Sequence, residues 1–528
     1  PRVPWQSLTG PTASCYSPGG GSGATYTMYQ MVADVRRLLP RMFDAAGRST
    51  GRRLVNDADL TANIDPTTGL AYTPHTVTLP ENGTGNQVPQ SAGASLVVVY
   101  RDPREPLRRI LTYDGIAISP NLEGAKFVQN IRGIFQSSAT KSTRQTLIGA
   151  GGQPNPYDRI FFKGGQGSAP GTLLKTDGFS ATSSASDRAW ASVTLEGSDL
   201  NPLMPGATDT TNGFGESVTT TIDHTFRTPY DCLTVGALIF SAALKDSDKD
   251  GLPDGVEDRV GNLTYDADGT PLPDLNAMGA RSDRRDIFIQ MDAMKTAGAT
   301  TYGDATAPYN SQFTSVTVPA HNHLPNVAAI KKLIDAYINA PLDSTTSATV
   351  MPHIDIGDLT AYHDMGTGYA DTTAIDQYLV TNSPRGGHLV QEQPCGISED
   401  PTQNCRFKFF PGTAGLKGFT RYDNDVSLMD PIRNDYFHHV FYVHALARGR
   451  SINPCLVPAT GKNADGSCTT DNPAYHSPKS TSGIARLPGN KVVVSLGLWD
   501  KTLGTGTAHQ IGATTLHELG HNGELFHG

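Results

Sequence analysis

Between residues 86 and 243 the chain carries short hydrophobic or alternating stretches, separated by polar turn residues. Alternation with a period of two is typical of a strand that buries one face. Several such strands at short spacing favour two antiparallel sheets packed face to face. We therefore predict a β-sandwich over residues 86–243. Its strand candidates are Ser95–Tyr100, Arg109–Tyr113, Arg159–Phe162, Ala191–Leu195 and Ser217–Ile222, and Asp114-Gly115 is predicted to be a turn.

From residue 281 to residue 528 the pattern changes to a mixture of helix and strand signals. Hydrophobic side chains recur at three- and four-residue steps over Leu324–Ile338, which predicts a helix. A closing helix is predicted at Ile511–Asn522. The region therefore reads as an α/β domain. Its strand candidates are Asp286–Met291, Met351–Ile356, Tyr436–Leu446 and Lys491–Leu496.

Two further segments complete the predicted organisation of the chain. Residues 1–85 are rich in Gly, Pro and Thr and form an N-terminal extension with one short helix, Met28–Leu39. Residues 244–280 are rich in Asp and form a connector between the sandwich and the α/β domain. The sequence thus predicts a multidomain protein with two folded parts.

The composition of the 528-residue chain excludes two broad classes of protein. Lys and Arg number 42 against 51 Asp and Glu, and a net charge of −9 leaves no basic surface for nucleic acid. No hydrophobic run approaches the roughly 18 residues that a membrane-spanning helix needs. We expect neither a nucleic-acid partner nor a transmembrane segment in this chain.

Six cysteines point to an exported protein. An even number allows complete pairing, and the Cys spacings of structural zinc sites are absent from the sequence. The pairs Cys395–Cys405 and Cys455–Cys468 would each close a short loop that has little hydrophobic core of its own. The pair Cys15–Cys232 follows by elimination. We predict these three disulfides and a secreted, extracellular or cell-surface location.

The segment Asp246–Glu257 matches the pattern D-x-D-x-D-G-x5-E of a calcium-binding loop. Calcium takes about six to eight oxygen ligands, and alternate carboxylates on a tight loop supply them. Gly251 allows the sharp turn, whereas Pro253 differs from a standard EF-hand. We predict a structural Ca²⁺ ion here. Its predicted ligands are Asp246, Asp248, Asp250, the carbonyl of Leu252, Asp254 and Glu257.

A second, weaker calcium candidate follows in the same connector. Asp266, Asp268 and Asp274 stand around Gly269, but they lack the full loop pattern. The alternative is an acidic turn exposed to solvent.

The last residues of the chain carry an HExxH motif. His517 and His521 are four residues apart, so on a helix both imidazoles lie on one face and can hold one Zn²⁺ ion. His527 follows after a glycine that can end the helix, and it can fold back as the third ligand. Glu518 can act as general base on a metal-activated water. The alternative is a helix with three unrelated surface histidines.

HExxH with a third histidine ten residues after the first resembles the metzincin clan of zinc endopeptidases. The resemblance covers residues from near 244 to 528 and is closest to secreted multidomain bacterial metalloproteases, in which an Asp-rich calcium loop precedes the catalytic domain. It rests on Asp250–Glu257, Leu275–Ala280, Asp286–Asp292, Ser482–Ala485 and His517–Asn522.

The resemblance implies a fold and a way of holding substrate. Residues 281–528 would be the upper subdomain of a metzincin-like α/β catalytic domain, with Lys491–Leu496 as the edge strand that binds an extended peptide. The clan's methionine turn comes after the third histidine, so we expect the translated protein to continue beyond residue 528. Ser95–Pro103 resembles β-sandwich modules of bacterial surface proteins, which implies association with the cell surface.

One position departs from the clan pattern. Glu524 stands where the clan has glycine, and the glycine has moved to Gly523. Either the turn starts one residue earlier, or Glu524 is left-handed at a cost of about 1–2 kcal/mol. The placement of His527 depends on this turn.

The other histidines carry no metal-site spacing in the sequence. His438, His439 and His444 flank a predicted strand and are expected to pack or to form hydrogen bonds. His321, His323, His353, His363 and His388 show no ligand spacing either.

Together these features predict a secreted zinc- and calcium-dependent metalloendopeptidase, a hydrolase that acts on a protein or peptide substrate. The alternative is a cell-surface binding or structural protein whose zinc site is vestigial and inactive. Catalysis that requires Glu518 would separate the two.

Overall fold

A computed structural model of the chain describes its secondary structure over most of its length. The six cysteines lie outside the described residues, and so do the three predicted disulfides. The described residues are 5–9, 29–44, 49–79, 91–100, 102, 104–119, 125–136, 142–150, 158–167, 169–179, 190–205, 213–223, 233–259, 264–302, 316–340, 349–391, 428–444, 446–449, 476–479, 482–497 and 505–527.

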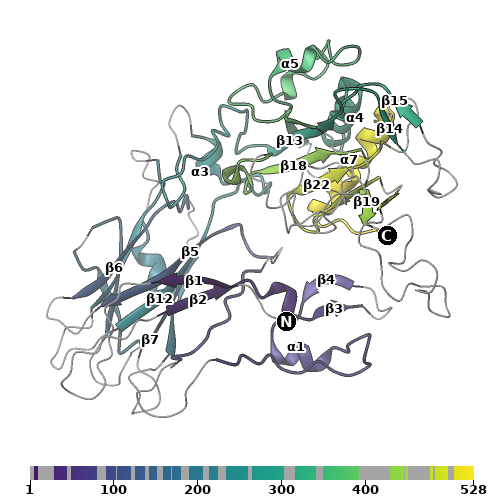
Figure 1. The fold of residues 1–528 in the computed structure, drawn as a ribbon. Helices are drawn as coiled ribbons and strands as arrows, with labels where there is room; N and C mark the ends of the chain where they lie inside the picture. The colour runs from purple at the N-terminus through teal and green to yellow at the C-terminus, as the bar shows by residue number, and fades with distance from the viewer. Residues whose placement is uncertain are drawn as a thin grey trace. The chain divides into compact units, whose positions relative to one another are not determined.

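The chain divides into two compact units, built mostly from β-sheets with few helices (Figure 1). The first unit comprises residues 1–245, 253–255 and 263–270. The second unit comprises residues 246–252, 256–262 and 271–528. The main change from one unit to the other, at residue 245, is close to the predicted end of the sandwich at residue 243.

Two four-stranded antiparallel sheets form the centre of the first unit. One sheet has the order β10 (Trp190–Leu195), β7 (Thr143–Ala150), β12 (Leu233–Ala243) and β5 (Arg108–Ser119). The other has the order β6 (Lys126–Ile131), β11 (Val218–Asp223), β8 (Arg159–Gly164) and β9 (Thr172–Thr176).

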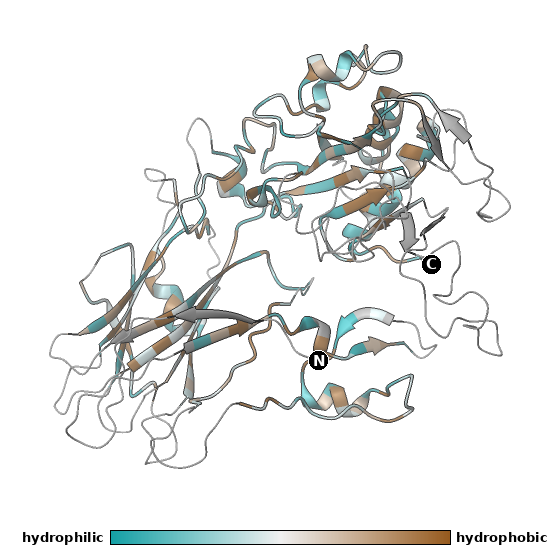
Figure 2. Ribbon diagram, viewed as in Figure 1, coloured by the Kyte–Doolittle hydropathy of each residue, from teal (hydrophilic) through white to brown (hydrophobic). Residues whose placement is uncertain are grey.

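The two sheets share one hydrophobic core, which confirms the predicted β-sandwich. Hydrophobic and hydrophilic residues are interspersed along the strands (Figure 2). Phe162 of one sheet and Phe240 of the other are both fully buried and stack with 6.4 Å between ring centroids. Burial of such side chains contributes about 1.5–3 kcal/mol each, so this core holds the two layers together.

One turn prediction and one strand prediction in the sandwich were wrong. Asp114-Gly115 is not a turn, because β5 continues through it and takes up one extra residue opposite β12 as a bulge. Gly115 has φ of +144° there, which glycine tolerates. Ser95–Tyr100 forms no strand, and its side chains from Leu96 to Tyr100 are exposed, so its hydrophobic run reflects no buried face.

The N-terminal region of the first unit contains short elements. The predicted helix over Met28–Leu39 was wrong, because residues 29–33 pair with an N-terminal strand and only a short 3-10 turn follows. The N-terminal elements are β1 (Trp5–Thr9), β2 (Tyr29–Ala33), a 3-10 turn (Arg36–Leu38), β3 (Arg41–Phe43), β4 (Ser49–Arg53) and α1 (Asp57–Ala62). Between β10 and β11 the first unit also contains α2 (Gly197–Leu200) and a 3-10 turn (Asn201–Leu203).

A six-stranded sheet organises the second unit. The strands are parallel except for β21, and β17 pairs with the last residues of β13. The order is β16 (Val350–Asp355), β13 (Arg285–Lys295), β18 (Phe437–Tyr442), β22 (Lys491–Val494) and β21 (Gly483–Ala485), with β17 (Leu389–Gln391) beside β13.

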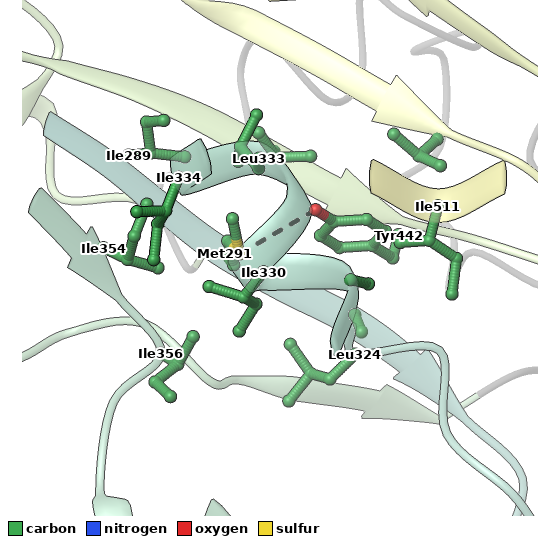
Figure 3. Close-up of a cluster of buried hydrophobic side chains, with 14 of the residues drawn as sticks. Ile289, Met291, Leu324, Ile330, Leu333, Ile334, Ile354, Ile356, Tyr442 and Ile511 are labelled. Atoms are coloured by element: carbon green, nitrogen blue, oxygen red, sulfur yellow. Dashed lines mark hydrogen bonds between the residues drawn. The ribbon is translucent and has the colours of Figure 1, made fainter. Parts of the chain in front are cut away.

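Helices α4 (Val327–Ile338) and α7 (Ala508–Asn522) pack on one face of this sheet. In the core that the two helices form with the sheet, Tyr442 of β18 donates a hydrogen bond to the sulfur of Met291 on β13 at 3.8 Å (Figure 3). Ile330 of α4 and Ile511 of α7 are buried in the same cluster. Both helix predictions are confirmed, because their hydrophobic spacing reports this buried face.

The edge of the sheet differs from the sequence prediction. Lys491–Leu496 was expected at the edge, but β22 lies between β18 and β21. The edge strand is the short antiparallel β21, which pairs with residues 492–494 of β22. The run of valines in β22 is buried, as a strand with neighbours on both sides requires.

The remaining elements of the second unit are short. No helix in the described part of the chain combines the length and hydrophobicity needed to span a bilayer. These elements are β14 (Thr300–Tyr302), β15 (Val316–Val318), α5 (Leu359–His363), β19 (Leu446–Gly449), β20 (His476–Lys479) and 3-10 turns at Asp376–Tyr378 and Pro431–Arg433, while α3 (Asp254–Glu257) falls where the chain passes between the units.

Candidate metal centres

Helix α7 presents the histidines of the HExxH motif. It begins with a capping box, in which the Thr507 hydroxyl accepts from the Gln510 N–H and the Gln510 side chain accepts from the Thr507 N–H. The helix buries Ile511, Thr515 and Leu519 against the sheet. Because His517 lies on the opposite side of this buried stripe, its imidazole is exposed.

A Schellman motif reverses the chain at the end of α7. The N–H of Leu525 donates to the carbonyl of Gly520 at 2.9 Å, and the N–H of Glu524 donates to the carbonyl of His521 at 3.0 Å. Glu524 occupies the left-handed position with φ of +70°, whereas Gly523 has φ of −83°. Of the two sequence alternatives, the strained glutamate is therefore the one observed, and the turn still returns His527 to the helix.

The three predicted zinc ligands converge. The Nε2 atom of His527 lies 3.0 Å from Nε2 of His517 and 3.0 Å from Nε2 of His521. Nitrogens bound to one tetrahedral zinc at about 2.0–2.1 Å lie roughly 3.3 Å apart. The donor set and its spacing therefore fit a zinc ion.

Hydrogen bonding fixes which nitrogen of His521 carries its lone pair. Nδ1 of His521 lies 2.7 Å from the carbonyl oxygen of Leu525, and a carbonyl only accepts. Nδ1 therefore carries the proton, and Nε2 faces the other two imidazoles with its lone pair. The partial desolvation of this largely exposed ring and the two neighbouring imidazoles lower the pKa of His517, which favours its neutral, ligating form.

Glu518 follows His517 in α7 and interacts electrostatically with His521, but it does not belong to the group of three imidazoles. Its side chain is 5% exposed, and it packs against the edge strand, because a Cβ on Gly483 of β21 would lie 2.7 Å from its Cγ. Burial raises the pKa of Glu518 to about 7, against a lowering by His521. The sequence did not single out Gly483 for this role, since only the fold brings β21 to the helix.

The predicted calcium loop folds around its carboxylates. The N–H groups of Lys249 and Gly251 donate to the Asp246 carboxylate at 2.7 and 3.1 Å. Gly251 has φ of +96°, which confirms its predicted role in the turn. Carboxylate oxygens of Asp246, Asp248 and Asp250 lie within 4.8 Å of one another.

A second group shares Asp250 and adds a residue that the sequence pattern missed. Asp250, Glu257 and Asp286 each offer an oxygen within 4.8 Å of the others, and Glu257 and Asp286 are buried. The N–H of Asp286 also donates to Asp250 at 2.7 Å. Asp286 is the second residue of β13 and lies far along the chain from the loop, so no local spacing could indicate it.

Burial and the nearby negative charges raise the pKa values of two carboxyl groups in the loop. Burial, with the neighbouring Asp246, raises the pKa of Asp248 to about 6. Burial, with the charges of Asp248 and Asp246, raises the pKa of Asp250 to about 7. A divalent cation would offset this repulsion.

Asp254 is placed differently from the other predicted calcium ligands. It forms an ion pair with Lys245 at 2.6 Å, within the first unit. The carboxyl groups that the described residues bring together around Asp250 do not include it. The carbonyl of Leu252 belongs to the same turn, where the Leu252 N–H donates to Asp250 at 2.7 Å.

The weaker calcium candidate is not brought together as a metal site among the described residues. Asp266 pairs with Arg109, and Asp268 accepts from the N–H of Thr270 at 2.8 Å. Asp274 accepts from the N–H of Ala277 at 3.0 Å. Asp268 and Asp274 thus accept hydrogen bonds within turns, whereas Asp266 forms an ion pair.

Comparison with known proteins identifies no family. No protein-family model matches the chain, and no curated protein sequence matches it. Two structures of infectious bursal disease virus, strains Gx and Gt, are similar over 46% of this chain at 12% identity, with TM-scores of 0.15 and 0.16. The matches span 57% and 56% of those chains, little more than half. Desmodium yellow mottle tymovirus matches 33% of this chain and 100% of its own at 12% identity, with a TM-score of 0.12.

Proposed function

We propose that the second unit is a zinc-dependent endopeptidase of the metzincin type. The observation that carries the proposal is the convergence of the three Nε2 atoms of His517, His521 and His527 beside the buried carboxyl group of Glu518. Three neutral imidazoles are the ligand set of many catalytic zinc sites, and they leave a fourth position open. When bound, zinc would polarise the scissile carbonyl and make a water molecule more acidic.

Glu518 carries the proton chemistry in this proposal. Its position next to His517 in α7 sets its carboxyl group beside the imidazole group, where it accepts a proton from the attacking water. The same carboxylic acid then donates the proton to the leaving amine. Packing against Gly483 limits the movement of the Glu518 side chain, which keeps its carboxyl group within reach of the attacking water and of the leaving amine.

The edge strand β21 supplies a binding surface for substrate. Among the described residues β21 pairs with β22 alone, and we propose that its other edge pairs with an extended peptide by main-chain hydrogen bonds. Because Gly483 of β21 contacts Glu518, a peptide on that edge would run close to the base. A protein or peptide substrate in an extended conformation fits this arrangement.

Metal removal tests the proposed activity. Chelator-treated protein is expected to lose hydrolysis of an unfolded protein substrate, and added Zn²⁺ is expected to restore it. His521→Ala removes one ligand and should lose both the activity and the zinc bound at this site, whereas His509→Ala, an exposed histidine on the same helix, should keep both. Hydrolysis by metal-depleted protein would contradict the proposal. Folded, zinc-loaded protein without hydrolysis would favour a binding protein with a vestigial site.

We also propose that the loop Asp246–Leu252, with Glu257 and Asp286, binds Ca²⁺. Hard carboxylate oxygens gathered on a tight turn are the ligands that calcium prefers. The ion would connect the loop to the start of β13 within the second unit. It would therefore stabilise the fold rather than take part in hydrolysis.

Calcium titration is expected to raise the melting temperature of zinc-loaded protein. An ion present at a hundred times its Kd adds about 2.7 kcal/mol, which is a shift on the order of 5–10 °C for a unit of this size. Asp250→Asn should abolish the shift, because Asp250 belongs to both carboxylate groups. Asp268→Asn, in an exposed turn, is the matched control and should keep it. Equal shifts in both variants would place calcium elsewhere.

A further inference from the structure

We propose that His321, His323 and His444 form a second transition-metal site, separate from the histidines of α7. One nitrogen of each imidazole lies within 4.8 Å of one nitrogen of the other two. The ring centroids of His321 and His323 are 4.9 Å apart, and the ring centroid of His444 lies 6.4 Å from that of His321 and 5.4 Å from that of His323. The proposal does not depend on peptidase activity.

The backbone explains how His321 and His323 come to share one side. The N–H of Thr296 donates to the carbonyl of His321 at 2.8 Å, and the N–H of His323 donates to Met294 at 2.9 Å. Asn322 thus bridges the end of β13 in an extended conformation. Alternate residues of an extended segment point to the same face, so this His-Asn-His sequence presents two imidazoles together.

His444 reaches the same place from the end of β18. Its carbonyl accepts from the N–H of Gly497 at 2.8 Å, and the N–H of Val443 donates to Val494 at 2.8 Å. A Cβ on Gly497 would overlap with Nδ1 of His444, so a side chain at position 497 would displace the imidazole. Glycine at this position makes room for the ring.

A hydrogen bond to a backbone carbonyl shows which nitrogen of His321 carries the lone pair. Nδ1 of His321 lies 2.7 Å from the carbonyl oxygen of Pro319, so it carries the proton. The lone pair is then on Nε2, as in metal-bound histidines whose other nitrogen donates to a carbonyl. The same arrangement occurs at His521 in the candidate zinc site.

The donor chemistry selects the class of metal. The group contains imidazoles and no carboxylate, so it suits zinc, copper or nickel rather than calcium or magnesium. His323 and His444 are 4% and 1% exposed, and His321 is partly exposed. An ion here would tie the segment that leads into α4 to the end of β18, and we choose zinc as the probe.

Zinc content of the full chain tests the proposal. The variant His517→Ala/His521→Ala removes the ligands on α7, and after zinc loading and gel filtration it is expected to retain one zinc per chain. Adding His321→Ala is expected to remove that zinc, because His321 is the most exposed of the three and its loss disturbs the core least. Adding His509→Ala instead is the matched control and is expected to change nothing.

Cobalt(II) supplies a second readout that is independent of the third substitution. Cobalt bound to three imidazoles in the His517→Ala/His521→Ala protein is expected to give visible d–d absorption that zinc abolishes. No retained zinc and no cobalt absorption in this folded variant would overturn the proposal. Zinc that stays after His321→Ala is added would also overturn it, since the ion would then lie elsewhere.

Discussion

Replacing Glu518 with alanine is expected to abolish peptide hydrolysis and to leave the zinc content unchanged. Three histidines would hold the metal and Glu518 is not one of its ligands, so the substitution removes the proposed base and no ligand. General-base catalysis by a positioned carboxylate contributes about 10²–10⁴-fold to the rate, and we expect a loss in this range or greater. Peptidase assays with metal analysis on the same sample measure both quantities.

A matched glutamate separates the chemical effect from general damage. The side chain of Glu196 is exposed in the first unit and pairs with the exposed Arg144, so Glu196→Ala should keep full activity. Glu518→Gln tests the role further, because it keeps the shape and hydrogen-bonding capacity but cannot accept the proton. Activity in either Glu518 variant near that of the unmodified protein would show that another group acts as the base.

The convergence of His517, His521 and His527 could be predicted because its information is local. Helical geometry alone places His517 and His521 on one face, and a reversal of a few residues after α7 returns His527. The same applies to Asp246, Asp248 and Asp250 on one tight turn. The cost of the turn at Glu524 was also foreseen as one of two alternatives, and the structure selects the left-handed residue.

Residues that depend on the sheet could not be predicted from spacing. His444 meets His321 because β18 lies beside β13, a pairing between segments that are distant in the sequence. From the sequence, His438, His439 and His444 are all expected to pack or to form hydrogen bonds, and the structure confirms this for His438 and His439. For the same reason the spacing in the sequence did not indicate Asp286 as a member of the carboxylate group. The sequence also predicted β22 as the edge strand, whereas the edge strand is β21.

A buried ion pair at the end of strand β16 gives the second large expected effect. Arg433 is 2% exposed, and its Nη1 donates to the Asp355 carboxylate at 2.6 Å and to Gln290 at 2.9 Å. Asp355 is fully buried and also accepts from the N–H groups of Arg385 and Gly386, both at 2.8 Å. Each side chain thus neutralises the buried charge of the other, and both form further hydrogen bonds.

Arg433→Met is expected to lower the free energy of unfolding of the second unit by about 3–5 kcal/mol, because it leaves the Asp355 carboxylate buried without its counter-charge. Urea unfolding followed by hydrogen exchange in β13 and β16 measures the effect in this unit alone. Lys331→Met breaks an exposed ion pair with Asp335 on α4 and should cost less than about 1 kcal/mol. Adding Asp355→Leu to Arg433→Met should recover part of the loss, because no uncompensated charge then remains. If the two single Met variants are equally stable, the buried pair contributes no more than a surface pair.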